Sequence, residues 1–176
     1  MGLKAMAMVE VKIAGLVQDK FNHNLWVVLL EDEANKRILP IWIGTFEANA
    51  IAMELSSQVT PRPMTHDLIK NILGSLDVQV DWVAVNDIRD NTYYAIIMLR
   101  SNGKEIAIDA RPSDSIAIAL RCKVPILVSE QVIEKKAAID ISLPKKDEKG
   151  DDWIDQMVED IQTSPPKPKE EEEPED

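Results

Sequence analysis

Charged and polar side chains gather at a point in the sequence where a strand should end and a helix should begin. In the stretch DARPSD, Asp109, Arg111, Ser113 and Asp114 follow one apolar segment and precede another. A helix start offers unpaired backbone N–H groups and the positive end of the helix dipole, and both favour anions. An arginine there can hold a phosphate or a carboxylate through two hydrogen bonds, and aspartate oxygens can bind Mg²⁺.

The same stretch also suits a helix start that has no chemical role. Pro112 fits the first helical position, and Ser113 and Asp114 are common in a first turn. Asp109 and Arg111 can form an ordinary surface ion pair. The local pattern therefore leaves a functional and a purely structural interpretation open.

A second polar cluster lies in the stretch RPMTHD. His66 lies at a predicted helix N-terminus, where the dipole favours the neutral imidazole that a general base requires. Asp67 is the next residue, so its side chain points about 100° away around the helix and the two make a poor direct pair. The alternative is that Thr65 and Asp67 cap the helix while His66 is exposed. One further histidine, His23, is present, so we do not expect a site with several histidine ligands.

A third segment, GTFEANAIAMEL, begins another predicted helix, with Thr45 as its cap and Glu47 in the first turn. Glu47 is either a metal ligand or a charge that the dipole favours. An offset of 65 residues places the apolar residues of this region over those of the later strand and helix: Ile41, Ile43, Ile51, Ala52 and Leu55 over Ile106, Ile108, Ile116, Ala117 and Leu120. A structural duplication would make the junctions IGTFEA and DARPSD equivalent, either facing one another or lining one side of the sheet.

The order of elements predicts an α+β fold. Alternating or apolar runs indicate strands at 9–19, 25–32, 36–44, 76–87, 92–100 and 104–109, with a short strand near 124–129. Helical spacing and punctuation indicate helices at 45–56, 65–74 and 112–122, and a short one after residue 129. We expect a mostly antiparallel or mixed sheet, built from a duplicated β-β-β-α unit, with the helices packed on it.

Composition limits the classes of protein to consider. The net charge is −11, but residues 145–176 hold 13 acidic and 5 basic residues and so account for −8 of it. The other 144 residues carry a net charge of −3, which is close to neutral, and they show no basic stripe. A generic nucleic-acid binder is therefore not expected. The single Cys122 excludes an internal disulfide, and there is neither a secretory signal nor a run of about 18 apolar residues. We expect a cytoplasmic location and no contact with a membrane.

The chain divides into a domain and a charged C-terminal region. Residues 8–140 form the predicted domain, and 141–151 form a charged linker. Residues 152–162 can make a short amphipathic helix, while 163–176 are too polar and acidic to fold alone. This acidic tail is a candidate site for a protein partner. Phosphate-loop, dinucleotide and paired-cysteine motifs are absent from the sequence, so we expect no nucleotide cofactor.

Three segments, ILPIWIGTFEANAIAMEL, RPMTHDLIKNIL and DARPSDSIAIALR, in this order and spacing, resemble the bifunctional nuclease (BFN) domain family. The resemblance covers about residues 8–140. It implies an α+β domain with nuclease activity on DNA and RNA. Hydrolysis of phosphodiester bonds assisted by Mg²⁺ or Mn²⁺ fits the carboxylates and arginines of these motifs. The positions in the shared motifs suggest roles for particular residues. These are His66 as base, Asp67 or Glu47 as its support, Asp109, Asp114 and Glu47 as metal ligands, and Arg62, Arg111 and Ser113 as substrate contacts.

Two other functions remain open. The motifs could organise a non-catalytic interaction module that assembles into a homo-oligomer, because apolar strands need cover on both faces of a sheet. The anion site could also bind a small phosphorylated metabolite. Cleavage of nucleic acid by the pure protein separates the nuclease from both alternatives.

Overall fold

The computed structural model describes residues 7–20, 22–135 and 139–140. The contacts between residues divide the chain into two units, Met1–Leu143 and Pro144–Asp176. Every helix and strand described here belongs to the first unit. The predicted linker, short helix and acidic tail lie outside the described residues. Within the described part, no helix combines the length and the apolar character needed to cross a membrane.

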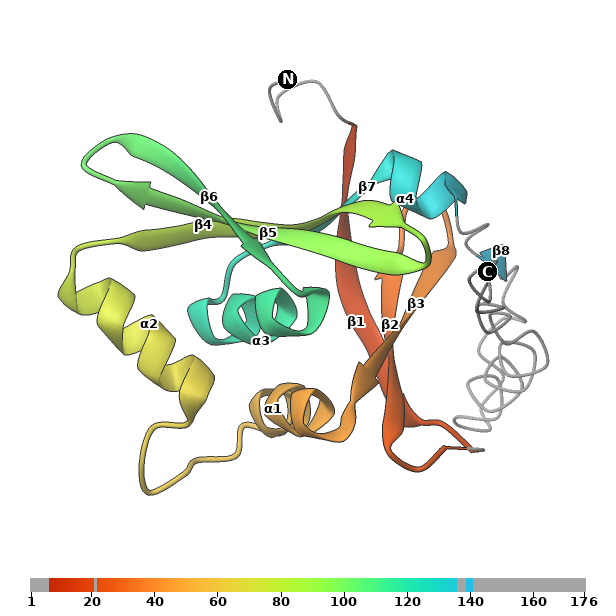
Figure 1. Cartoon of the computed structure of the whole chain (residues 1–176), viewed down its shortest axis with the longest axis horizontal. Helices are drawn as coiled ribbons and strands as arrows, with labels where there is room; N and C mark the ends of the chain where they lie inside the picture. The colour runs from red at the N-terminus through yellow and green to blue at the C-terminus, as the bar shows by residue number, and fades with distance from the viewer. Residues whose placement is uncertain (1–6, 21, 136–138, 141–176) are drawn as a thin grey trace, which may run out of the picture. The chain divides into compact units, whose positions relative to one another are not determined.

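Eight strands and four helices follow one another along the described chain (Figure 1). Their bounds are β1 Met8–Gln18, β2 Leu25–Asp32, β3 Arg37–Gly44, α1 Thr45–Leu55, α2 Thr65–Ser75, β4 Gln79–Arg89, β5 Thr92–Ser101, β6 Lys104–Ala110, α3 Pro112–Cys122, β7 Ile126–Ser129, α4 Glu130–Lys135 and β8 Ile139–Asp140. The strands form one sheet in the order β6-β5-β4-β7-β1-β2-β3-β8. Neighbouring strands are antiparallel except for β4 and β7, which run parallel, so the predicted mixed α+β fold is confirmed.

Three strands followed by a helix occur twice, as β1-β2-β3-α1 and as β4-β5-β6-α3. These two β-β-β-α segments differ in the burial of the apolar side chains on their third strand. Ile41 and Ile43 of β3 lie in the core, whereas Ile106 and Ile108 of the edge strand β6 are exposed. The predicted duplication stays a prediction.

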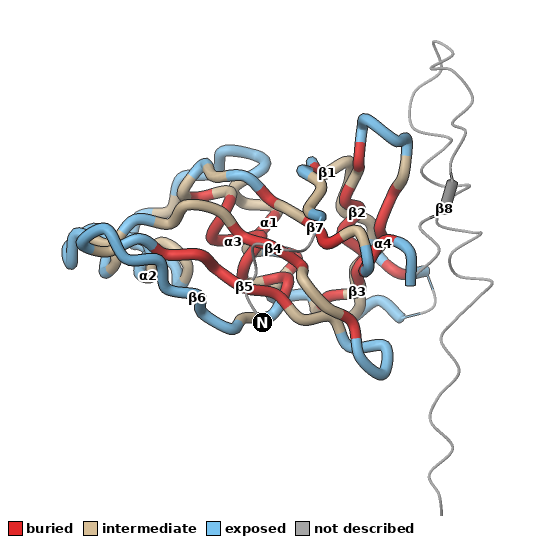
Figure 2. The backbone as a smooth tube through the Cα atoms, turned by 90° about the horizontal axis from the view of Figure 1, so that it is seen from above, coloured by how far each residue is buried: buried red, intermediate tan, exposed pale blue. Residues whose placement is uncertain are grey.

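The inner strands of the sheet are buried on both faces, as the red segments in Figure 2 show. Val27 to Leu30 of β2 are all buried although alternate side chains point to opposite faces, and so are Ala95 to Leu99 of β5. The sheet curves far enough for the Tyr93 hydroxyl of β5 to donate a 3.3 Å hydrogen bond to the carbonyl oxygen of Pro40 in β3. The homo-oligomer expected from an uncovered sheet face stays a prediction, but these inner strands do not require it.

One residue with an extended backbone precedes each of the helices α1, α2 and α3. Gly44 and Arg111 have extended backbone angles and immediately precede α1 and α3. The expected caps Thr45 and Thr65 were each placed one residue too late, because Gly44 and Met64 occupy the cap positions. For α2 the cap comes from within the helix, since Asp67 Oδ2 accepts a 2.8 Å hydrogen bond from the Met64 N–H.

Candidate functional site

Arg111 joins the two strand-to-helix junctions. Its Nε donates to Asp114 Oδ2 at 2.8 Å and its Nη2 to Asp114 Oδ1 at 3.2 Å, which is a two-point contact. Its Nη1 donates to Glu47 Oε1 at 2.9 Å. The hydrogen bonds that Arg111 donates to Asp114 and Glu47, together with the negative charge of these carboxylates, raise the Arg111 pKa above its usual range. The junctions IGTFEA and DARPSD are therefore in contact through Arg111 and Glu47, while the duplication that would make them equivalent stays a prediction.

Gly44 makes room for the Glu47 carboxylate. A Cβ atom added to Gly44 would lie 2.5 Å from Glu47 Oε2, closer than real Cβ contacts. The glycine at the end of β3 thus allows Glu47 to fold back against the start of α1 and reach Arg111. No positive backbone angle requires a glycine at this position, so the requirement is one of space.

His66 contacts the same aspartate as Arg111. Its Nε2 lies 3.3 Å from Asp114 Oδ1, and its side chain is 13% exposed. Burial alone would raise the Asp114 pKa, but hydrogen bonds from Arg111 and His66 outweigh it, so that pKa lies below its usual value of 3.8. Asp114 therefore stays ionised at neutral pH and can orient both an imidazole and a guanidinium.

Asp67 has a different partner, one that sequence reasoning missed. Its Oδ1 accepts a 2.6 Å hydrogen bond from Nε of Arg121, which is only 4% exposed. Arg121 also donates Nη1 hydrogen bonds to the carbonyl oxygens of Ala50 at 3.1 Å and Ala117 at 2.9 Å. One buried arginine thus ties α1, α2 and α3 together. An arginine at the end of the apolar run SIAIALRC is the signal that could have revealed it.

Both oxygens of Asp67 are occupied by these contacts. Burial raises the Asp67 pKa, but the hydrogen bonds from the Met64 N–H and from Arg121 outweigh it, and the pKa lies below its usual value. The geometry supports a structural task for Asp67, which is to cap α2 and to hold Arg121. A direct role in chemistry stays a prediction.

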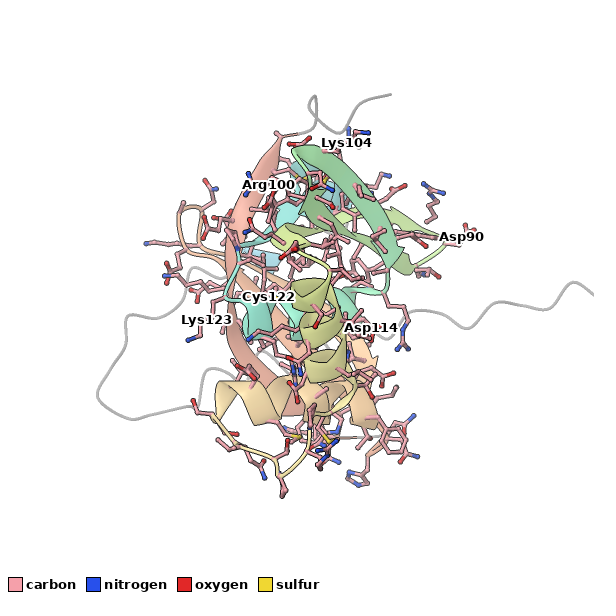
Figure 3. All side chains as sticks on the ribbon, turned by 90° about the vertical axis from the view of Figure 1, so that its left-hand side faces the viewer. Asp90, Arg100, Lys104, Asp114, Cys122 and Lys123 are labelled. Atoms are coloured by element: carbon pink, nitrogen blue, oxygen red, sulfur yellow. The ribbon has the colours of Figure 1, made fainter. Side chains whose placement is uncertain are left out.

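Most of these side chains line a cavity of about 700 Å³, which we call the three-helix pocket. It lies among α1, α2, α3 and the strands β5 and β6, and its polar residues include Glu47, His66, Asp109, Arg111, Asp114 and Arg121. In Figure 3 Asp114 lies on one side of α2, and Cys122 and Lys123 lie on the other. A larger hollow of about 800 Å³, beside Cys122 and Arg100, contains none of the predicted site residues.

The remaining predicted residues lie at varying distances from this cluster. Asp109 ends β6, is exposed and lines the three-helix pocket. Ser113 is buried and lines a neighbouring cavity of about 400 Å³, which Glu47 and Arg111 also border. Arg62 is exposed in the loop before α2 and lines another hollow, so the structure does not bring it to the three-helix pocket.

The predicted metal ligands do not form a ready metal site. Among the described residues, no three His, Cys, Asp or Glu side chains gather closely enough to hold an ion. Glu47 and Asp114 are instead bridged by the Arg111 cation. In this arrangement Arg111 neutralises two of the three carboxylates predicted as ligands, and the use of Mg²⁺ or Mn²⁺ stays a prediction.

The fold and the three motifs place the chain in a known class of protein. The bifunctional nuclease domain family matches residues 27–141. The chain belongs to this family.

Relatives in bacteria and plants share the domain. An uncharacterized protein of Mycobacterium tuberculosis is 43% identical over 124 residues, which cover 70% of this chain and 73% of the relative. "Bifunctional nuclease 1" of Oryza sativa subsp. japonica is 29% identical over 119 residues, covering 66% of this chain and 36% of the plant protein. "Bifunctional nuclease 2" of the same plant is 30% identical over 105 residues, covering 58% and 32%.

Proposed function

We propose that this protein is a nuclease that hydrolyses phosphodiester bonds in DNA, RNA or both, and that the three-helix pocket is its active site. The observation that carries the proposal is the shared contact of Arg111 and His66 with Asp114. It places a cation suited to phosphate next to a candidate base. The names of the plant relatives support the same class of reaction.

Arg111 supplies the phosphate contact in this proposal. Its side chain is 66% exposed, so a substrate can reach the guanidinium despite the two carboxylates. A phosphodiester takes the place of one carboxylate contact and binds through its non-bridging oxygens. As water adds to phosphorus, negative charge grows on those oxygens, and the fixed cation stabilises it.

His66 supplies the base. In the tautomer that carries its proton on Nε2, toward Asp114, the other ring nitrogen, Nδ1, can accept a proton. A water oxygen attacks phosphorus while Nδ1 takes its proton, the bond from phosphorus to the leaving oxygen breaks, and that oxygen takes a proton from solvent. Asp114 stabilises the resulting imidazolium, as the carboxylate of a catalytic triad does. Arg111 occupies Glu47 and Asp114, so the proposed reaction uses protein side chains and water.

One alternative has an observation in its favour. Leu68 and Ile72 of α2 and Leu76 directly after it are exposed at four-residue spacing, which suits a surface that contacts another protein or another copy of this chain. On that interpretation the charged cluster only organises the helices. A homo-oligomer, a partner for the acidic tail and a cytoplasmic location remain part of the proposal, as does the binding of a phosphorylated metabolite as a further alternative.

Cleavage by the pure protein tests the proposal. Single- and double-stranded DNA and RNA are incubated with wild type in Mg²⁺, in Mn²⁺ and in EDTA, beside the variant His66→Gln. Loss of the base should lower the rate about 100-fold or more. The surface variant Arg100→Ala, whose partner Asp81 lies outside the pocket, should cut like wild type. If wild type cuts no faster than His66→Gln, the nuclease proposal is wrong.

A further inference from the structure

One large aromatic side chain lies open to solvent at the three-helix pocket. Phe46 is 89% exposed, although it lines the pocket and directly precedes Glu47, the partner of Arg111. Its neighbours on α1, Ala48 and Ile51, are almost fully buried in the core. Phe46 therefore contributes little to packing, and its position beside the charged cluster calls for another explanation.

The rest of the pocket continues this apolar surface. Phe46, Ala50 and Met53 line it from α1, at the four- and three-residue steps that place side chains on one helix face. Met64 lines it from just before α2 and Ile69 from within α2, while Ile97, Ile108 and Ile118 line it from the sheet and α3. Its volume of about 700 Å³ lies within the range of sites for small organic groups.

The pocket thus combines two kinds of surface. Apolar walls with an exposed ring suit a flat aromatic group, and Arg111 suits a phosphate. Asn49 also lines the pocket from α1, and its side-chain amide can donate and accept hydrogen bonds at the edge of a base. A nucleotide presents a flat base and a phosphate at a short separation, so it matches both surfaces at once.

We infer that the pocket takes one unpaired nucleobase of the substrate strand, which stacks on Phe46 while an adjacent phosphate binds Arg111. This inference deepens the proposed nuclease function and rests on it. In a duplex the bases are stacked and paired inside, so filling the pocket requires one base to be turned out of the helix. The protein therefore prefers single-stranded DNA or RNA over the matching duplex.

The preference has a second physical source. Outside residues 145–176 the chain carries a net charge of −3 and no basic stripe, and a base pocket offers sequence-independent binding that does not depend on many phosphate contacts. A protein that holds a duplex only by its backbone needs several cations along one face. With Arg111 as the main cation of the pocket, stacking supplies the affinity that charge does not.

The test compares Phe46→Ala with Phe46→Tyr and with Val59→Ala. Val59 is 91% exposed in the loop before α2 and does not line the three-helix pocket, so it controls for the loss of an exposed apolar side chain. Binding is followed by the fluorescence of 2-aminopurine in a single-stranded oligonucleotide, and KM and kcat are measured on single-stranded and duplex forms of one sequence.

Phe46→Ala loses the stacking contact, so its affinity for the single-stranded oligonucleotide should be about fivefold or more below that of wild type. KM should rise to the same extent with kcat little changed, Phe46→Tyr should restore both, and Val59→Ala should match wild type. The preference for single strands should shrink in Phe46→Ala.

Three results would overturn the inference. The first is a wild type that cleaves nucleic acid while Phe46→Ala binds and cleaves like Val59→Ala. The second is equal cleavage of single strands and duplexes by wild type. The third is a change of oligomeric state in Phe46→Ala by light scattering, which would mean that Phe46 contacts another copy of the chain. If wild type binds the single strand through Phe46 but cuts nothing, the base pocket stands and the proposed nuclease function fails.

Discussion

Arg111 and Glu47 lie 64 residues apart in the chain, yet Nη1 of the arginine donates a 2.9 Å hydrogen bond to Oε1 of the glutamate. This contact connects the start of α1 to the residue that precedes α3. Asp114 extends it to His66 at the start of α2. Three helix starts thus meet at one pocket, and the positive ends of their dipoles favour an anion there.

Replacing Gly44 should disturb this arrangement through Glu47. In Gly44→Ala the new Cβ would lie 2.5 Å from Glu47 Oε2, so the carboxylate must turn away from Arg111. We expect kcat/KM for oligonucleotide cleavage to fall about fivefold. Because the effect acts through Glu47, the double variant Gly44→Ala/Glu47→Gln should be no worse than Glu47→Gln alone. Additive losses in this double-mutant cycle would show that Gly44 acts in another way.

The buried Arg121 should matter for stability. In Asp67→Asn the Arg121 guanidinium loses its ionised partner, and we expect the free energy of unfolding to fall by about 2 kcal/mol. The exposed pair of Arg100 and Asp81 serves as the control, since Arg100→Ala should cost less than about 1 kcal/mol. Urea unfolding measures both. Equal losses in the two variants would contradict the role given to Arg121.

Acid should weaken the fold through Asp67 and Asp114. Both carboxyls have a pKa below 3.8 in the folded protein, because their cationic and N–H partners outweigh burial. The stability they contribute is fully present above the unfolded pKa near 3.8 and is lost as pH falls through the lower folded pKa. Urea unfolding from pH 6 down to about pH 3 should show a decline below about pH 4. The decline should be shallower in Asp67→Asn, and an identical slope would refute the assignment.

We expect Mn²⁺ to bind tightly beside Glu47 and Asp114 only after Arg111 has been removed. Because Arg111 bridges Glu47 and Asp114, wild type should bind Mn²⁺ weakly at this place, and Arg111→Ala should bind it more tightly. Thermal unfolding in the presence and absence of Mn²⁺ measures this without any need for activity. The added stabilisation should disappear in Arg111→Ala/Glu47→Gln. Tight Mn²⁺ binding by wild type that Glu47→Gln abolishes would show that the metal displaces the arginine.

Much of the fold could be predicted from the sequence because its signals are local. Apolar alternation, proline at the start of α3 and glycine before α1 indicate the elements and their junctions. A contact between the two junctions was one of two arrangements expected from a duplication that itself stays a prediction. The position of the caps was missed by one residue, because Asp67 caps α2 from its own first turn.

The contacts that build the pocket were harder to predict. The pairing of Asp67 with Arg121 spans 54 residues and depends on how α2 packs against α3. The exposure of Ile106 and Ile108 follows from the edge position of β6, which no local pattern reveals. Arg62 lies outside the pocket because the loop before α2 turns its side chain toward another hollow, and loop geometry is not written in residue spacing.

The most direct test of the central claim is a matched pair of arginine variants in single-turnover cleavage of a short oligonucleotide. Arg111→Ala removes the cation of the pocket, and Arg100→Ala removes an arginine of similar exposure that is paired with Asp81 elsewhere. If Arg111 stabilises charge on the reacting phosphate, Arg111→Ala should cut about 100-fold more slowly than wild type while Arg100→Ala cuts at the wild-type rate. Equal rates for the two variants, with both folded, would contradict the proposed active site.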